Sequence, residues 1–191
     1  LLTGSNKIKT AVFISGTGSN LKSLILFSKL KKSPISINLI ISNNSKSKGL
    51  KLGNIFKIKK KIFDFENKNL TETKIISELK KNKIDLICLA GFMKILSKKF
   101  INNFKGNIIN IHPSLLPKFK GLNTHERAIQ NKERYSGCTV HFVNSKLDSG
   151  RIVIQKKVKI NKNDTPKTLA KKILTQEHIL YPKAILKIFS L

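Results

Sequence analysis

The segment 110–117 (NIHPSLLP) carries the side chains with the most obvious chemical use. It continues a short apolar run, and alternation along a strand would place Asn110 and His112 on the same face. An amide and an imidazole that converge on one point are the donors that a developing oxyanion needs, and the imidazole can also exchange a proton near neutral pH. The competing interpretation is a core histidine beside a turn-forming asparagine, which is the better one for an isolated Asn-x-His pair.

A glycine-rich turn at 15–20 (SGTGSN) separates an apolar run from an amphipathic segment. Its glycines allow a tight turn, and amide N–H groups at the start of a helix attract anions. The turn is not a dinucleotide fingerprint, because Leu21 occupies the third glycine position and the next apolar run ends at 42–44 (SNN) without an acidic residue. It is not a P-loop, since no Gly-Lys-Ser/Thr follows. Phosphate binding and a plain tight turn stand as equal alternatives.

A third candidate is Asp148 in the turn 147–150 (LDSG). An aspartate there is ordinarily a turn former, but as an orienting group or proton partner of His112 it would belong to a catalytic centre. His125 and His141 are more consistent with structural roles. The four histidines show no metal-ligand spacing, so the sequence predicts no metal site.

The elements that must position these residues follow from hydrophobic periodicity. Apolar runs predict strands at 10–15, 35–42, 61–65, 85–90, 107–111, 139–143 and 152–160. Helical spacing predicts helices at 21–30, 49–56, 71–81 and from about Thr168 onward. This alternation favours an α/β fold: a single domain over 1–191 with a mainly parallel, Rossmann-like sheet and helices on both faces. Ligands of such sheets bind beyond the carboxyl ends of the strands.

The composition is dominated by charge, with 38 Lys and Arg against 10 Asp and Glu, a formal +28. Only three of these cations are arginine, and residues 1–95 and 96–191 each carry 19 cations and 5 acids, so there is no basic tail. A nucleic-acid-binding module would show clustered arginine and exposed aromatic residues, whereas this chain has no Trp and two Tyr.

The sequence also predicts the compartment of the protein. No apolar run approaches the length of about 18 residues that a membrane-spanning helix needs, and residues 1–9 do not resemble a signal peptide. Cys88 and Cys138 lie fifty positions apart without a Cys-x-x-Cys pairing, which argues against a disulfide or a structural zinc. We therefore expect a cytoplasmic protein without a membrane partner.

Seven motifs together closely resemble those of the folate-dependent phosphoribosylglycinamide formyltransferases, from about Lys9 to about Ile188. They are SGTGSNL at 15–21, AGFMKIL at 90–96, NIHPSLLP at 110–117, GLNTH at 121–125, VHFV at 140–143, LDSG at 147–150 and QEH at 176–178. Each motif is weak alone, but their ordered spacing is specific.

The resemblance implies transfer of the formyl group of 10-formyltetrahydrofolate, a co-substrate, to the amine of 5'-phosphoribosylglycinamide in de novo purine biosynthesis. It implies a substrate-binding N-terminal half, a catalytic and folate-binding C-terminal half, no metal, no nucleic-acid partner, and a monomer or homodimer. The site residues that it assigns are Asn110, His112 and Asp148 for catalysis; Gly18, Ser19, Asn20 and Glu177 for the substrate's phosphate and ribose; and Met93, Lys94, Ile95, Leu96 and Val143 for folate.

In the chemistry of that family the amine attacks the formyl carbon. Asn110 and a protonated His112 would stabilise the oxyanion of the tetrahedral intermediate, each such donor typically contributing roughly 3–4 kcal/mol. Asp148 would favour the imidazolium and help to move a proton, through water, from the attacking amine to the leaving folate nitrogen.

Four positions depart from the family pattern. Lys94 stands where arginine is common and cannot make the same planar fork, which affects the expected folate contact. Lys120 replaces a proline and Asn123 replaces a histidine. Arg151 replaces the proline that follows two glycines in relatives, so the loop that carries Asp148 is expected to move differently.

Three alternatives compete with this interpretation. The methionyl-tRNA formyltransferases share the 110–117 element, but they lack the 15–20 turn and need an added C-terminal barrel, for which no residues follow Leu191. Formyltetrahydrofolate hydrolases usually carry an extra N-terminal domain and a second histidine at the position of Pro113. A basic nucleic-acid-binding module is the alternative from a different class.

Overall fold

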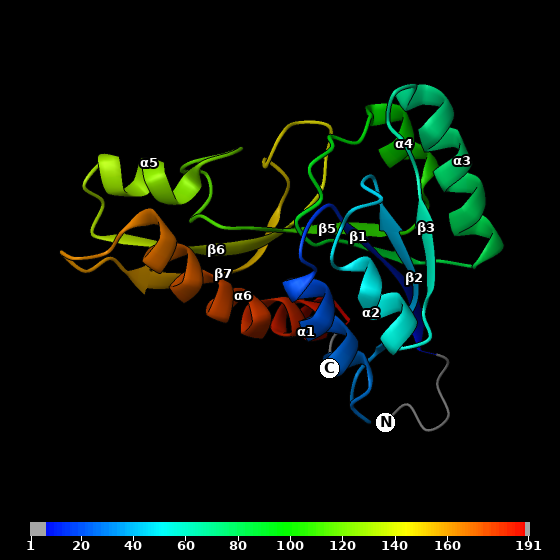
Figure 1. Ribbon diagram of the computed structural model, residues 1–191, viewed down its shortest axis with the longest axis horizontal. Helices are drawn as coiled ribbons and strands as arrows, with labels where there is room; N and C mark the ends of the chain where they lie inside the picture. Colours follow the sequence, from blue (N-terminus) through cyan, green and yellow to red (C-terminus); the bar gives the residue numbers. More distant parts are fainter. Residues whose placement is uncertain (1–6, 190–191) are drawn as a thin grey trace. The chain divides into compact units, whose positions relative to one another are not determined.

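The computed structural model describes residues 7–189 (Figure 1). These residues form two compact units, 7–108 and 109–189, and each is described by itself. Their strands and helices alternate in the first unit and follow a different, antiparallel pattern in the second.

The first unit is built of four parallel strands in the order β3-β2-β1-β4. Its elements are β1 (Ile8–Ile14), α1 (Ser19–Ser28), β2 (Ile35–Ser42), α2 (Leu50–Ile55), β3 (Lys59–Ile62), α3 (Lys68–Lys81), β4 (Leu86–Leu89) and α4 (Lys98–Asn103). The predicted parallel α/β arrangement is confirmed here.

Strand β1 explains why the apolar runs of this unit do not alternate with polar residues. It pairs with β2 on one side and β4 on the other, and its residues from Thr10 to Ile14 are completely buried. A strand covered on both faces requires apolar side chains at successive positions. Helix α1 adds Leu21 and Leu24, which are also completely buried, to the same core.

The second unit contains three antiparallel strands in the order β5-β6-β7. Its elements are β5 (Asn107–His112, which begins at the end of the first unit), α5 (Thr124–Gln130), β6 (Tyr135–Phe142), β7 (Ile152–Lys159) and α6 (Pro166–Ile188). Helix α6 packs against β6 and β7. A capping box between Thr165 and Thr168 starts it, and the buried hydroxyl of Tyr181 donates to the Ile109 carbonyl of β5 at 3.1 Å.

Several predicted boundaries differ from the observed ones. The strand expected at 61–65 lies at Lys59–Ile62, where it pairs with β2 although its four residues are exposed. Strand β6 begins at Tyr135, four residues before the predicted start. Helices α4 and α5 were not predicted, because six or seven residues are too few to establish a hydrophobic period.

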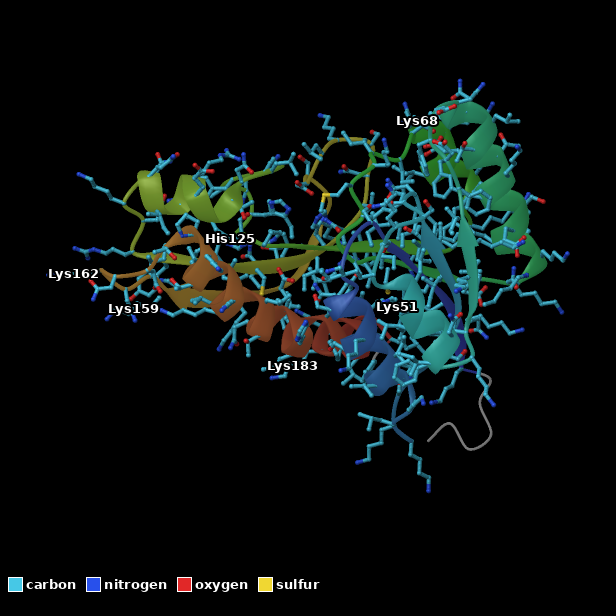
Figure 2. The ribbon with its side chains drawn as sticks, viewed as in Figure 1. Lys51, Lys68, His125, Lys159, Lys162 and Lys183 are labelled. Atoms are coloured by element: carbon cyan, nitrogen blue, oxygen red, sulfur yellow. The ribbon has the colours of Figure 1, made fainter. Side chains whose placement is uncertain are left out.

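The cations are spread over both units. The lysines labelled in Figure 2 stand on or beside different elements: Lys51 on α2, Lys68 on α3, Lys159 on β7, Lys162 before α6 and Lys183 on α6. The part of the chain that the structure describes contains no helix with the length and hydropathy needed to cross a membrane.

Candidate active site

Strand β5 places two of the predicted catalytic side chains. Asn110 pairs with His141 of β6, and His112 pairs with Thr139. Because side chains two positions apart share a face of a strand, the amide and the imidazole point to the same side, as the sequence predicted. His112 is 5% exposed, so its imidazole lies in a largely desolvated position.

The carboxylate of Asp148 is the common partner of these groups. Its Oδ2 lies 3.4 Å from His112 Nδ1 and accepts a hydrogen bond from the Gly121 amide at 2.9 Å. Its Oδ1 accepts from Asn110 Nδ2 at 3.5 Å. The side chain is only 8% exposed. The structure thus brings Asn110, His112 and Asp148 together in the second unit.

His141 belongs to the same cluster, although the sequence favoured a structural role for it. Its Nδ1 lies 2.8 Å from the carbonyl of Phe142, which can only accept, so Nδ1 carries a proton. Its Nε2 faces Asn110 Nδ2 at 3.2 Å and Asp148 Oδ1 at 3.6 Å. The signal that could have found it is the β5–β6 pairing, which sets His141 directly opposite Asn110.

The loop that carries Asp148 is held in a defined shape. Asp148 has φ +44°, a left-handed conformation that aspartate tolerates better than most residues. A Cβ on Gly150 would lie 1.7 Å from the Phe142 carbonyl oxygen, so only glycine fits there. Two positions that depart from the family pattern reinforce the loop: Lys120 donates to the Ser149 hydroxyl, and the Arg151 guanidinium lies 4.5 Å from the centre of the Phe142 ring.

Burial sets the charge of the histidine. Desolvation lowers the pKa of His112 from its usual value, and the Phe119 carbonyl and the Asp148 carboxylate only partly offset this. Burial alone would raise the pKa of Asp148, but the close approach of His141, the hydrogen bond from the Gly121 amide and the nearby His112 bring it below its usual value. The favoured state at neutral pH is an ionised Asp148 beside a neutral His112. The protonated His112 that the resemblance implies for the tetrahedral intermediate stays a prediction.

The partners of the two ring nitrogens of His112 would stabilise its protonated form. Its Nε2 lies 2.9 Å from the Phe119 carbonyl oxygen, so Nε2 carries the proton of the neutral ring. The lone pair of Nδ1 then faces Asp148 Oδ2. A second proton on Nδ1 would therefore point at an anionic acceptor. An imidazolium in this position would have an acceptor beside each nitrogen, the Phe119 carbonyl at 2.9 Å and the Asp148 carboxylate at 3.4 Å.

The predicted phosphate turn lies in the first unit, at the carboxyl end of β1. Gly18 has φ +77°, and a Cβ there would lie 2.6 Å from the Cα of Gly49. The Gly16 carbonyl accepts from the Ser47 hydroxyl at 2.6 Å and the Gly49 amide at 3.0 Å, which fixes the turn. Helix α1 then begins at Ser19 without a side-chain cap or an acidic residue in its first turn, so its amino end is electropositive.

The predicted folate residues 93–96 follow β4, also at its carboxyl end. Met93 and Ile95 are 63% and 60% exposed, whereas Leu96 is buried in the core. The other predicted binding residues lie in the second unit: Val143 directly follows β6, and Glu177 is a buried residue of α6. Two exposed apolar side chains at the ligand end of a parallel strand suit an aromatic ring system.

Comparison with known proteins identifies the family. The formyl transferase family model matches residues 8–185. The chain belongs to this family. It is 42% identical over 180 residues to the phosphoribosylglycinamide formyltransferase of Haemophilus influenzae, covering 93% of this chain and 85% of that protein. A crystal structure of phosphoribosylglycinamide formyltransferase from Brucella melitensis is 40% identical, with a TM-score of 0.90 over 96% of both chains.

Longer relatives carry the same region as one part of their length. The chain is 40% identical over 182 residues to the trifunctional purine biosynthetic protein adenosine-3 of Homo sapiens, covering 94% of this chain. It spans only 18% of that protein's length, and the same 18% of the corresponding protein of Gallus gallus. The resemblance that the ordered motifs indicated is confirmed.

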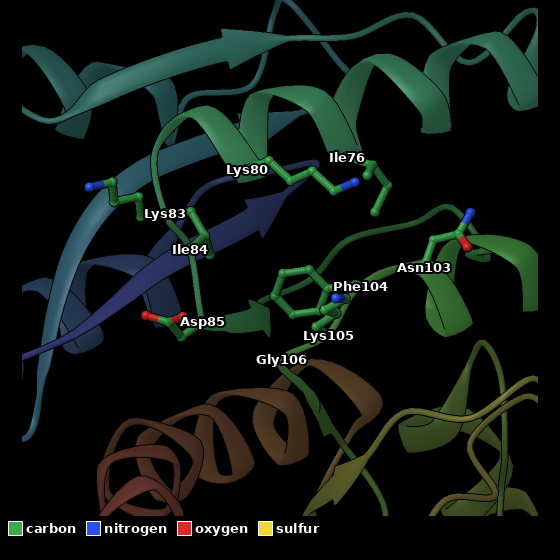
Figure 3. Close-up of a pocket in the computed structure, with 9 residues that line it drawn as sticks. All are labelled: Ile76, Lys80, Lys83, Ile84, Asp85, Asn103, Phe104, Lys105 and Gly106. Atoms are coloured by element: carbon green, nitrogen blue, oxygen red, sulfur yellow. The ribbon is translucent and has the colours of Figure 1, made fainter.

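Other features of this formyl transferase chain lie outside the predicted site. A cavity of about 280 Å³ in the first unit, shown in Figure 3, lies at the amino end of β4 beside Asp85 and Phe104, away from the end where parallel sheets bind ligands. Burial raises the pKa of the Cys138 thiol to about 12, so it is no nucleophile. Within residues 7–189, no group of His, Cys, Asp and Glu is arranged to hold a metal ion.

Proposed function

We propose that this protein transfers the formyl group of 10-formyltetrahydrofolate to the amine of 5'-phosphoribosylglycinamide in purine biosynthesis. The observation that carries the proposal is the buried cluster of Asn110, His112 and Asp148, in which the Asp148 carboxylate lies within 3.5 Å of both partners. Residues 1–191 would act as one formyltransferase domain. A cytoplasmic location, a monomer or homodimer, and the absence of nucleic-acid and membrane partners belong to the same proposal.

The protonation states of Asp148 and His112 suggest how the residues of the cluster act. Attack of the amine on the formyl carbon creates an oxyanion and an ammonium group, which must lose a proton. Water and the Asp148 carboxylate relay that proton to Nδ1 of neutral His112, which becomes an imidazolium whose Nδ1–H faces Asp148. The tetrahedral carbon then collapses, and the proton passes to the folate nitrogen as it leaves. Atoms and charge balance without a metal.

The oxyanion would be stabilised by the Asn110 amide and by His112. In the structure Nε2 of His112 donates to the Phe119 carbonyl, so the oxyanion would replace that carbonyl as the acceptor. Asn110 is already oriented, because its amide group is shared between Asp148 and His141. A donor that is fixed before the reaction needs no reorganisation when the negative charge develops.

The remaining residues would bind the two substrates. The turn at Gly18, Ser19 and Asn20 suits the phosphate, because backbone amides and the start of a helix favour an anion. Glu177 would accept from the ribose hydroxyls. The pterin ring of the folate would contact the exposed apolar side chains around Lys94, with Val143 as a further contact.

An assay with both substrates tests this function. The wild-type protein should form tetrahydrofolate only when glycinamide ribonucleotide is present, and His112→Ala should lower kcat by roughly a thousandfold, the loss typical of a general acid–base group that also stabilises an oxyanion. Asp164→Asn is the control, since Asp164 is a second carboxylate of this unit with a nearly buried side chain, but it pairs with Lys172 at 2.7 Å and takes no part in the cluster. Turnover that does not depend on the amine would indicate a hydrolase and contradict the proposal.

A further inference from the structure

The residues between β4 and α4 form an exposed segment that is fixed at both ends. We call residues 91–97 the strap. Its middle presents Met93 and Ile95, which are 63% and 60% exposed. Exposed apolar side chains on an irregular segment would ordinarily collapse onto the core, so something must hold the strap in its observed shape.

The first anchor is Ser15, the residue that follows β1. Its amide donates to the Gly91 carbonyl at 3.1 Å, and its hydroxyl accepts from the Met93 amide at 2.8 Å. The same hydroxyl donates to Asn43 Oδ1 after β2. Both hydrogen-bonding directions of one hydroxyl are therefore used, and the strap is tied to two neighbouring strands.

The second anchor is Glu72 of α3, a carboxylate that is only 5% exposed. One of its oxygens accepts from the Ser97 amide at 2.8 Å, and the other accepts from the Ser97 hydroxyl. That hydroxyl in turn accepts from the Phe100 amide at 3.0 Å and so caps α4. A buried carboxylate is costly unless it is hydrogen-bonded, and here both oxygens bind the same end of the strap.

The ring of Phe92 holds the strap between its two anchors. Its centre lies 5.3 Å from that of Phe13 and 5.7 Å from that of Phe65, both edge to face. With Phe92 and Leu96 turned to the core, Met93 and Ile95 are left facing outward.

We propose that Glu72 and Ser15 are positioning residues that keep the strap in the shape that receives the folate ring. This inference rests on the proposed function, because it gives the strap a folate to bind. A wall fixed in advance binds its ligand without the cost of ordering it, so loss of an anchor should appear in folate affinity. The phosphate turn should be spared, because contacts of the Gly16 carbonyl hold it instead.

Steady-state kinetics of Glu72→Gln and Ser15→Ala provide the first test. In each variant we expect the KM and the directly measured Kd for 10-formyltetrahydrofolate to rise roughly tenfold, which corresponds to the loss of one hydrogen bond that holds the strap. The KM for glycinamide ribonucleotide and kcat should stay within about twofold to threefold. Ser15→Thr, which keeps the hydroxyl, should restore most of the affinity.

Matched controls separate positioning from general stability. Glu78→Gln removes a carboxylate from the same helix that pairs with Lys59 instead, and Ser36→Ala removes a strand hydroxyl that donates to Asn38. Neither should change folate affinity. Equal weakening in Glu78→Gln and Glu72→Gln, or unchanged folate affinity in both anchor variants, would overturn the inference.

Amide hydrogen exchange gives a readout that needs no activity. In Glu72→Ala, exchange at 93–97 should accelerate in the absence of any ligand, while β1 keeps its protection. If the wild-type protein fails to bind folate, the proposed function is wrong even when the anchors hold the strap. Unchanged exchange in this variant would contradict the anchoring itself.

Discussion

Replacing Asp148 by asparagine removes one charge from the cluster and changes little else. The asparagine oxygen can still accept from the Gly121 amide, and its volume matches the carboxylate. What is lost is the attraction between the carboxylate and the imidazolium that forms on His112, 3.4 Å away. At an effective dielectric constant of about 20, two unit charges at that distance interact by about 5 kcal/mol.

The net loss of free energy is smaller than this. The asparagine amide is a dipole that retains part of the attraction, and the cost of desolvating the carboxylate is removed together with its charge. A net loss of about 3–4 kcal/mol corresponds to a fall in kcat of roughly 10² to 10³. Because Asp148 also raises the pKa of His112, Asp148→Asn should lower this pKa further and move the acid limb of the pH–rate profile to lower pH. Steady-state kinetics between pH 5 and 9 measure both effects. A kcat within about threefold of wild type would refute the role given to the carboxylate.

Three further predictions concern single residues and conditions. Gly18→Ala should lower the melting temperature and raise the KM for glycinamide ribonucleotide at least tenfold, because the added Cβ would lie 2.6 Å from the Cα of Gly49. The control Gly16→Ala should do neither, since nothing lies within 4 Å of a Cβ at that position. In thermal melts, folding stability should fall as the pH drops below about 6.5. Burial lowers the pKa values of His112 and His125, so the unfolded chain binds more protons than the folded chain in this range. His125→Gln should flatten this dependence. The KM values of both anionic substrates should rise with salt, since the protein carries a formal +28 that salt screens; salt-independent KM values would contradict this steering.

The sequence allowed much of the first unit to be predicted, because most residues of its strands β1, β2 and β4 are buried. The run at 35–42 gave β2 with its observed bounds, since eight successive positions must suit a buried strand. Strand β3 was misplaced because its residues, KKKI, are all exposed and carry no apolar signal. Its position depends on backbone pairing with β2, which no local pattern encodes.

The cluster around Asp148 was predictable only where alternation along one strand determines it. Asn110 and His112 share a face for that reason, and the ordered motifs pointed to Asp148. The position of His141 beside Asn110 could not be predicted, because it depends on the antiparallel register of β5 and β6, which joins residues 31 positions apart. The lowered pKa of His112 could not be predicted, because it depends on how deeply the side chain is buried, and alternation along a strand does not determine that.

The most direct test of the account follows the formyl group itself. The protein is mixed with 10-formyltetrahydrofolate labelled in the formyl carbon and with glycinamide ribonucleotide, and the products are analysed by mass spectrometry. The proposed transfer should give one labelled N-formyl group on the ribonucleotide for each tetrahydrofolate formed, and this product should be lost in His112→Ala. Labelled formate as the main product, with the ribonucleotide unchanged, would contradict the central claim.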